Sequence, residues 1–231
     1  MKDCNGPGTT YNGPDLMMKR FIALTFVCWL FILPQQAGSA DVWHQVKRVI
    51  DGDTVVLNDG RKVRYLAVNA SELAHDGHAA EPFAEEAKRF NASQVDHKEI
   101  RLEFDKELTD QYGRTLAYIF VRTGALVNAA LLSNGYAYLL YDPQNQKYHS
   151  LLLQSQRAAM SARKGIWKDW KESPSVYTGN RQSRRFHLPT CPFGKRIKPQ
   201  NRVVFHRQWD AYWEGYAPAK RCLPEFKIPR E

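Results

Sequence analysis

Short runs of β-branched or alternating apolar residues predict strands along the middle of this 231-residue chain. Ile100, Leu102 and Phe104 alternate with charged residues, which is typical of a half-buried strand. The Asn-Asp-Gly sequence at residues 58–60 is a hairpin signal between two such runs. The predicted strands cover residues 46–57, which an Asp-Gly turn interrupts, and residues 62–68, 100–104, 115–121 and 136–141.

Apolar residues at helical spacing predict three helices. Pro82 suits the first turn of a helix, and Phe83, Ala87 and Phe90 follow on one face. The other two helices are predicted at residues 126–132 and, after Pro143, at residues 144–164. The last helix carries an apolar stripe of Tyr148, Leu151, Leu152, Ser155, Ala159 and Ala162, with Trp167 and Trp170 packing at its end.

Short strands with interposed helices predict an α+β fold that is mainly β. We expect a five-stranded OB-fold barrel with about three helices, followed by a small C-terminal segment. Periodicity alone does not separate this barrel from another α+β arrangement. A hydrophobic content of 43%, with 12% aromatic residues, excludes an intrinsically disordered chain.

The N-terminus has the order of regions found in a secretory signal. A Lys-Arg pair precedes an apolar run at residues 21–33, and small residues that suit cleavage end at Ala40. The run is shorter than the ~20 residues of a membrane-spanning helix, which favours cleavage over anchoring. We expect translation to start at Met17 or Met18, and the mature chain to be a secreted or periplasmic monomer without stable membrane association. The predicted organisation is a leader at 1–40, an OB-fold domain at 41–171, a linker at 172–184 and a small basic module at 185–231.

The net charge of +9 makes a polyanionic partner plausible, and it is concentrated at one end of the chain. Residues 180–231 contain twelve lysines and arginines but four acidic residues. This basic module is either a contact for nucleic acid or a solvated charged surface. Cys191 and Cys222 are the two cysteines of the expected mature chain, an even number that suits an oxidising compartment.

Acidic and basic residues around the Asp-Gly turn are candidates for chemistry on phosphate. Asp53 at a strand end offers hard oxygen ligands to a divalent metal, or serves only as a turn acid. Arg64 and Arg114 can each bind a phosphate group, although a solvent-facing strand arginine and a pair with Asp110 are the alternatives. Glu72 suits a general base that positions water, or is an exposed loop acid. Together these are the components of phosphodiester hydrolysis.

Two ordered motifs contain these residues. One is Ile-Asp-Gly-Asp-Thr at residues 50–54, followed by Arg64 and Glu72, and the other is T-D-x-Y-G-R-x-L-A-Y at residues 109–118. In these motifs the chain resembles the thermonuclease (staphylococcal-nuclease-like) family over about residues 46–167. The resemblance implies an OB-fold and a Ca²⁺-dependent nuclease that cuts DNA and RNA with little sequence specificity, at the bond to the 5′ oxygen. It also assigns phosphate binding to both arginines.

The sequence departs from the family at residues 69–72, Asn-Ala-Ser-Glu. The family usually has Asp-(Thr or Ala)-Pro-Glu here, and that aspartate is its second acidic metal ligand. Asn69 keeps an oxygen but removes one negative charge, so we expect a weakened Ca²⁺ site at Asp53 and Asn69. Tyr112 and Tyr141 are candidates for stacking on the nucleotide, with core or rim packing as the alternative. A catalytically weakened or inactive nucleic-acid-binding protein is the second hypothesis.

The C-terminal module resembles the small metal-binding module of Ada-type DNA-repair proteins. That module usually ends Pro-Cys-x-x-Cys, and Ala219 stands at the first of these cysteines. Three candidate ligands remain, His187, Cys191 and Cys222, whereas a structural zinc site takes four. We therefore expect a Cys191–Cys222 disulfide and no zinc.

Overall fold

The computed structural model describes residues 41–74, 79–172 and 175–223, together with Gly6 and Gly8. The expected start positions and the signal sequence lie outside the described residues. The chain from Asp41 onward forms one compact unit. Within the described ranges, no helix combines the length and apolar content that a membrane crossing needs.

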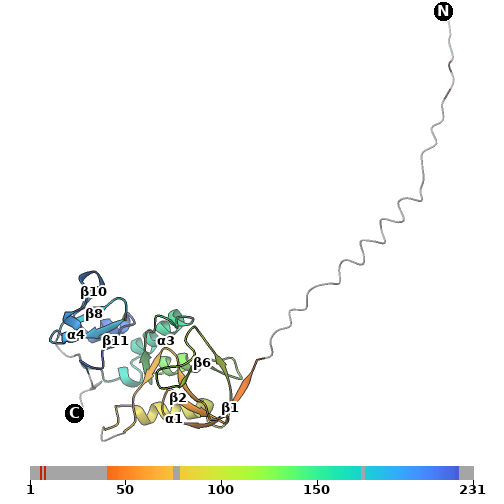
Figure 1. Cartoon of the computed structure of the whole chain (residues 1–231), viewed down its shortest axis with the longest axis horizontal. Helices are drawn as coiled ribbons and strands as arrows, with labels where there is room; N and C mark the ends of the chain where they lie inside the picture. Colours follow the sequence, from red (N-terminus) through yellow and green to blue (C-terminus); the bar gives the residue numbers. More distant parts are fainter. Residues whose placement is uncertain (1–5, 7, 9–40, 75–78, 173–174, 224–231) are drawn as a thin grey trace, which may run out of the picture. The chain divides into compact units, whose positions relative to one another are not determined.

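Five strands close into a barrel in the order β1-β2-β3-β6-β5. Strands β1, β2 and β6 of this barrel are labelled in Figure 1. The strands are β1 (Trp43–Val49), β2 (Thr54–Leu57), β3 (Lys62–Tyr65), β5 (Glu99–Glu103) and β6 (Thr115–Val121). Strands β3 and β6 are parallel, and the other neighbours are antiparallel. The predicted α+β fold with a five-stranded OB-fold barrel is therefore confirmed.

Aliphatic side chains from all five strands fill the barrel interior. Val46, Val55, Val63, Ile100 and Ile119 are each 0% exposed. Burying a side chain of this size stabilises a fold by about 1.5–3 kcal/mol. Asn128 is also fully buried, and its amide accepts a bond from the Ile119 N–H at 2.9 Å and donates to the Leu66 carbonyl at 2.8 Å. This amide holds the chain where it leaves β3.

The strand predicted at residues 62–68 is in fact two short strands. Strand β3 ends at Tyr65, and Ala67 adopts a positive φ of 59°. Strand β4 (Val68–Ala70) then leaves the barrel to pair with β7 (Ala137–Leu139). The prediction was wrong because residues 65–70 are all buried, on both faces of the chain, so an alternation of apolar and polar residues does not reveal the change of partner.

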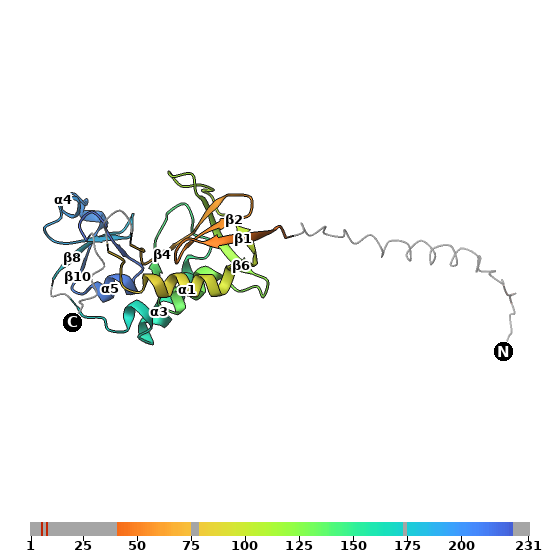
Figure 2. The same cartoon turned by 90° about the horizontal axis from the view of Figure 1, so that it is seen from below.

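Three helices have at least seven residues, and two shorter ones complete the five α-helices of the described residues. The long helices are α1 (Ala84–Val95), α2 (Val127–Ser133) and α3 (His149–Ser161). Helix α1 packs against the barrel through residues such as Ala87 and Val95 (Figure 2). The short helices are α4 (Pro192–Lys195) and α5 (Gln208–Trp213).

Helix α3 begins five residues later than predicted. The Asp142 carboxylate accepts bonds from the Gln144 N–H at 3.0 Å and from the Asn145 side chain at 2.7 Å, which forms a turn after Pro143. Leu151 was predicted on the buried stripe but is 45% exposed. The buried residues of α3 are Leu152, Gln156, Ala159 and Met160.

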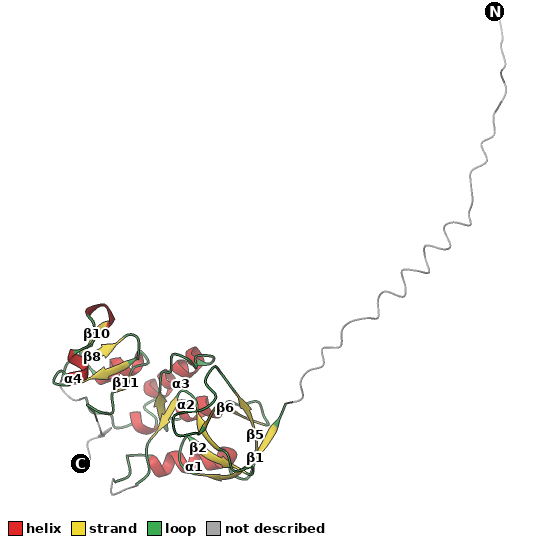
Figure 3. Ribbon diagram, viewed as in Figure 1, coloured by secondary structure: helices red, strands yellow, loops and turns green. Residues whose placement is uncertain are grey.

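A second, four-stranded sheet lies in the C-terminal part of the chain (Figure 3). Its strands are β10 (Arg202–Phe205), β8 (Tyr177–Asn180), β9 (Arg185–His187) and β11 (Ala217–Pro218), in that order. Strand β8 falls within residues 172–184, the expected linker. Of the two 3₁₀ helices, η1 (Gly165–Trp167) precedes the sheet in sequence, and η2 (Pro199–Asn201) lies between β9 and β10.

The C-terminal sheet shares a core with the end of α3. The Trp167 ring lies 5.5 Å from Trp170 and 5.1 Å from Tyr212 of α5. The Gln156 amide of α3 accepts a bond from the Leu139 N–H and donates to the Tyr212 carbonyl, both at 2.6 Å. The C-terminal module is therefore packed on the OB-fold domain through buried contacts.

Candidate active site

The Asp-Gly turn between β1 and β2 places Asp53 at a defined position. The Asp51 carboxylate accepts a bond from the Asp53 N–H at 2.9 Å, which orders the turn. A Cβ atom on Gly52 would lie 2.5 Å from the Cβ of Ala70 and 2.8 Å from that of Ala87. Only glycine allows the turn to approach β4 and α1 this closely.

Asp53 and Arg64 form a buried ion pair. Asp53 Oδ2 lies 3.0 Å from Arg64 Nη2 and accepts the Ala70 N–H at 2.7 Å, while Asp53 Oδ1 accepts the Thr54 hydroxyl at 3.1 Å. The two charged side chains are 8% and 11% exposed. Arg64 also donates from Nη1 to the Tyr65 carbonyl at 2.9 Å. The arginine thus points into the site rather than toward solvent.

The pKa of Asp53 is raised from 3.8 to about 7. Burial is the main cause, since it penalises the charged carboxylate. The Arg64 guanidinium and the Ala70 N–H oppose this rise, and the charges of Asp51 and Glu72 add to it. Asp53 therefore exchanges its proton near neutral pH, where a metal or a substrate would compete for the carboxylate.

Asn69 faces the same guanidinium as Asp53. Its Oδ1 accepts a bond from Arg64 Nη2 at 3.3 Å, and its Nδ2 donates to the Tyr138 hydroxyl at 3.1 Å. The β4–β7 register places Asn69 opposite Tyr138. Nothing in the sequence singled out Tyr138 as a site residue, because its contact with Asn69 depends on strand pairing between residues 69 positions apart.

The oxygens of Asp53 and Asn69 match the ligand type that Ca²⁺ prefers. Asp53 Oδ2 and Asn69 Oδ1 both lie close to Arg64 Nη2. A metal ion at the position of that nitrogen would therefore meet two hard oxygen ligands. One oxygen is a carboxylate and the other an amide, so this pair supplies a single negative charge. Among the described residues, the one trio of His, Cys, Asp or Glu side chains with metal-ligand spacing lies elsewhere, in the C-terminal module.

Glu72 follows β4 and is partly exposed. Its N–H donates to Glu81 Oε2 at 2.8 Å, and its carboxylate lies 3.3 Å from Lys220 Nζ. The charge of Glu72 contributes to the raised pKa of Asp53, so the two acids share one electrostatic environment. Lys220 comes from the C-terminal module and lies 148 residues from Glu72 in sequence. The sequence identified it only as one of the many basic residues of that module.

Arg114 lies directly before β6, the parallel neighbour of β3. Its Nε is 2.7 Å from Asp110 Oδ2, and its guanidinium lies 5.6 Å from the centroid of the Tyr112 ring. Tyr112 is 75% exposed. The β3–β6 register sets Arg64 opposite Leu116, so Arg64 lies on one strand and Arg114 immediately precedes its parallel neighbour. Arg114 is held by Asp110 and not by the Asp53 group.

Tyr141 lies two residues beyond β7 and is partly buried. Its ring packs edge-on against His149 at the start of α3, with 5.5 Å between the centroids. This contact places Tyr141 between β7 and α3, outside the hydrogen-bonded group of Asp53, Arg64 and Asn69.

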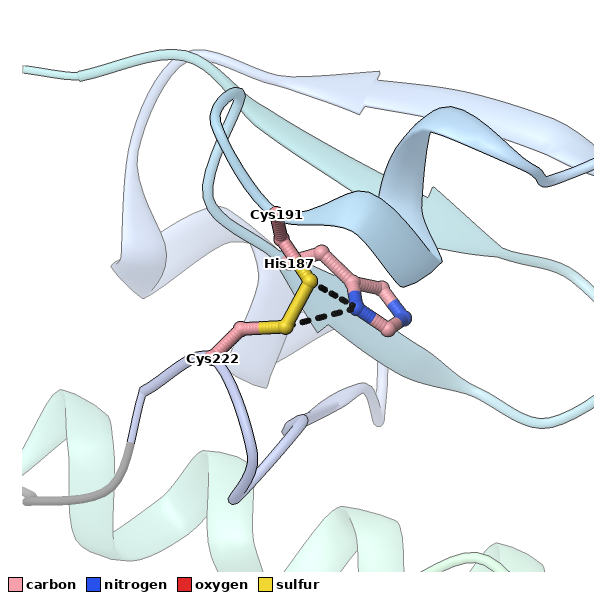
Figure 4. A group of neighbouring side chains, drawn as sticks. All are labelled: His187, Cys191 and Cys222. Carbon is pink, nitrogen blue, oxygen red and sulfur yellow. Dashed lines mark hydrogen bonds between the residues drawn. A yellow bond between two sulfur atoms is a disulfide. The ribbon is translucent and has the colours of Figure 1, made fainter.

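Cys191 and Cys222 are joined by a disulfide (Figure 4). Their Cα atoms are 5.7 Å apart, and His187 Nδ1 lies 3.4 Å and 3.7 Å from the two sulfur atoms. These three residues are the trio with metal-ligand spacing noted above. Because the sulfurs are bonded to each other, the imidazole is the remaining candidate ligand. Burial lowers the pKa of His187, since it disfavours the charged imidazolium.

Fold and site together define an OB-fold protein with a buried acid–guanidinium group at one end of its barrel strands. Residues 62–169 match the model of the family described as staphylococcal nuclease homologue. The chain is 35% identical over 141 residues to Thermonuclease of Staphylococcus intermedius, covering 58% of this chain and 83% of that protein. The chain belongs to the staphylococcal nuclease family.

Two further relatives carry the word endonuclease in their names. Endonuclease YncB of Bacillus subtilis (strain 168) is 36% identical over 160 residues, which cover 64% of this chain and 72% of that protein. Endonuclease YhcR of the same organism is 26% identical over 213 residues, covering 80% of this chain and 17% of that protein. The likeness to YhcR therefore extends beyond residues 62–169.

Proposed function

We propose that the chain is an exported, Ca²⁺-dependent nuclease that hydrolyses phosphodiester bonds of DNA and RNA with little sequence specificity. The observation that carries the proposal is the convergence of Asp53 and Asn69 oxygens on Arg64. Membership of a family with named nucleases supports the activity. The signal-like pattern of residues 1–40 and the Cys191–Cys222 disulfide support export, and we expect a monomer.

In this proposal Asp53 and Asn69 would hold the Ca²⁺ ion. The bound ion supplies positive charge near the phosphate and favours ionisation of water. Arg64 binds a non-bridging oxygen of the scissile phosphate, and Arg114 neutralises the charge that accumulates there in the transition state.

Glu72 is the proposed base. It accepts a proton from the attacking water, whose oxygen forms a bond to phosphorus as the bond to the 5′ oxygen breaks. The leaving 5′ oxygen takes up a proton from solvent water, and Glu72 releases its proton to solvent, so the products are a 3′-phosphate and a 5′-hydroxyl. Tyr112, which is largely exposed, stacks on a nucleotide base beside Arg114, and Tyr141 contributes to the rim of the site.

The direct test is to incubate the purified protein with single-stranded DNA and with RNA, first with Ca²⁺ and then with EGTA. We expect cleavage that EGTA abolishes. Arg64→Gln should reduce the rate by about 10²–10³-fold, since it removes a group that stabilises transition-state charge. Arg61→Gln is the control, because Arg61 pairs with Asp59 on the exposed hairpin. A chain that shows no Ca²⁺-dependent cleavage from neutral to alkaline pH would contradict the proposal.

The second candidate function is a nucleic-acid-binding OB-fold protein with weakened or lost catalysis. It is favoured by Asn69, which lowers the negative charge of the metal site, and by the Arg64–Asp53 pair, which competes with a cation for the carboxylate. Asn69→Asp separates the two functions. A large gain in cleavage would show a decayed site, whereas an already active nuclease would gain little.

A further inference from the structure

A polar pocket of about 430 Å³ opens on the C-terminal module, away from the Asp53 group in sequence. Four side-chain amides and two cations dominate its lining: Asn180, Gln182, Gln200, Asn201, Arg196 and Lys198. None of the residues that line it is acidic. The lining therefore offers hydrogen-bond donors and positive charge, which suit an anionic ligand with polar edges.

Internal hydrogen bonds hold the pocket walls in place. Arg202 donates from Nη2 to the Ile197 carbonyl at 2.8 Å, which ties β10 to the segment between α4 and η2. The Arg181 N–H donates to the Asn201 carbonyl at 2.8 Å, which ties the end of β8 to η2. Asn180 Oδ1 also accepts the Gln182 N–H at 2.9 Å. These bonds fix the backbone of the pocket walls before any ligand arrives.

An exposed aromatic ring also contributes to the lining. Phe193 of α4 is 41% exposed and lines the pocket. The guanidinium carbons of Arg196 and Arg221 lie 4.9 Å and 5.4 Å from the centroid of its ring. An aromatic face beside cations is the arrangement on which nucleic-acid bases stack.

Among the described residues, the cations near the pocket are not neutralised by neighbouring acids. In the part of the chain that the structure describes, no ion pair with a carboxylate is formed by Arg181, Lys195, Arg196, Lys198 or Arg221. Arg207, by contrast, pairs with Asp210 at 2.5 Å on the same module. The unpaired charges create a local positive potential that attracts a polyanion.

We propose that this pocket and Phe193 form a second nucleic-acid-binding site, which takes a single-stranded segment of DNA or RNA. A base stacks on Phe193, Arg196 and Lys198 contact the adjoining phosphates, and the amides reach polar edges of the base or sugar. The choice of ligand rests on the proposed nuclease function, because a second contact would retain a polymeric substrate between cleavage events. An acidic polymer without bases fits less well, since it would leave the exposed ring and the amides unused.

The test measures binding of the full chain to a labelled single-stranded oligonucleotide by fluorescence anisotropy in EGTA, so that cleavage plays no part. Phe193→Ala should weaken binding by about 5- to 150-fold, the range expected for the loss of one stacked base. Arg196→Gln should weaken binding and reduce the slope of log affinity against log salt by about one. Val204→Ala and Arg207→Gln, at an exposed apolar residue and a paired arginine, are the controls and should change little.

Inorganic polyphosphate is the competing probe. Phe193→Ala should leave its affinity unchanged, because polyphosphate has no base to stack. Equal losses for the oligonucleotide and polyphosphate in Arg196→Gln, with no loss in Phe193→Ala, would overturn the proposal in favour of a general polyanion surface. Unchanged oligonucleotide binding in both variants would also overturn it. Phe193-dependent binding by a chain that does not cleave would uphold this site while contradicting the proposed nuclease.

Discussion

Arg64 Nη2 lies 3.0 Å from Asp53 Oδ2 in the interior of the candidate active site. The same nitrogen donates to Asn69 Oδ1 at 3.3 Å, so a protein cation lies where two oxygen ligands meet. Asp53 also accepts bonds from the Ala70 N–H and the Thr54 hydroxyl, which leaves few free lone pairs on its carboxylate. Metal and guanidinium therefore compete for one acid, and the charge at residue 69 decides how strongly the metal competes.

Asn69→Asp should tighten Ca²⁺ binding by about tenfold or more. One added unit charge at contact distance contributes on the order of 1–4 kcal/mol near a protein surface, and each 1.4 kcal/mol is tenfold in affinity. Calorimetric titration with Ca²⁺ measures the change independently of activity. Asn58→Asp, on the exposed hairpin, should leave the affinity unchanged. Equal Ca²⁺ affinity in wild type and Asn69→Asp would show that residue 69 is not a ligand.

The raised pKa of Asp53 makes folding stability depend on pH. Between pH 3.8 and about 7 the folded protein keeps a proton on Asp53 that the unfolded chain has released. The contribution of Asp53 to the free energy of unfolding is thus fully present below this window and is lost as pH rises through it. Urea unfolding in EGTA at the two ends of the window should show the loss in wild type and not in Asp53→Asn.

Asp59→Asn is the comparison for this pH effect. The hydrogen bond from the Arg61 side chain lowers the pKa of Asp59, so its effect has the opposite sign and appears only as pH falls below the ordinary range of aspartate. Asp59→Asn should therefore keep the wild-type slope between mildly acidic and neutral pH. If Asp53→Asn keeps that slope too, another group is responsible for it.

Gly52→Ala should destabilise the fold by about 1–3 kcal/mol, the usual effect of forcing a methyl group into a filled space. The added Cβ would lie 2.5 Å from that of Ala70 and 2.8 Å from that of Ala87. Gly60→Ala is the comparison, because nothing lies within 4 Å of its Cβ position and only its positive φ of 89° opposes alanine. Urea unfolding should show the larger loss at Gly52, and cleavage should fall only there, since Asp53 is adjacent. Equal losses at the two glycines would contradict the close approach.

Removing the disulfide by Cys191→Ser with Cys222→Ser should lower the free energy of unfolding by about 3–4 kcal/mol, as expected for a bond that closes a loop of this length. The sequence separation of the two cysteines is 31 residues. Dithiothreitol should have the same effect on wild type and none on the double variant.

Lys220→Gln, two residues from Cys222, is a variant that separates stability from catalysis. Its ion pair with Glu72 joins side chains that are 58% and 43% exposed, so its loss should change the free energy of unfolding by under about 1 kcal/mol. We expect kcat to fall, because Glu72 loses the group that orients its carboxylate. An unchanged kcat would show that Lys220 is a surface contact without a role at the site.

Much of the fold could be predicted from local pattern. Residues of the barrel strands alternate or cluster as β-branched runs, and a turn sequence separates β2 from β3. The existence of these strands and their succession along the chain therefore follow from the sequence alone. The kinds of residue at the candidate site were also evident, because Asp53, Arg64 and Glu72 lie within twenty residues of one another in sequence. Local pattern also marked Cys191 and Cys222 as the pair available for a disulfide.

Only the tertiary structure decided which groups meet. Tyr138 reaches Asn69 across 69 residues and Lys220 reaches Glu72 across 148, and both contacts depend on how sheets pair and pack. The change of partner between β3 and β4 was hidden because residues 65–70 are buried on both faces of the chain. The sequence by itself determines the spacing of apolar residues and the kinds of side chain in each helix and strand, since these depend only on residues that are neighbours along the chain. Sheet register and the packing of the C-terminal module depend on the burial of surfaces that are distant in sequence. The register of the barrel strands decides that Arg64 faces Asp53 inside the protein.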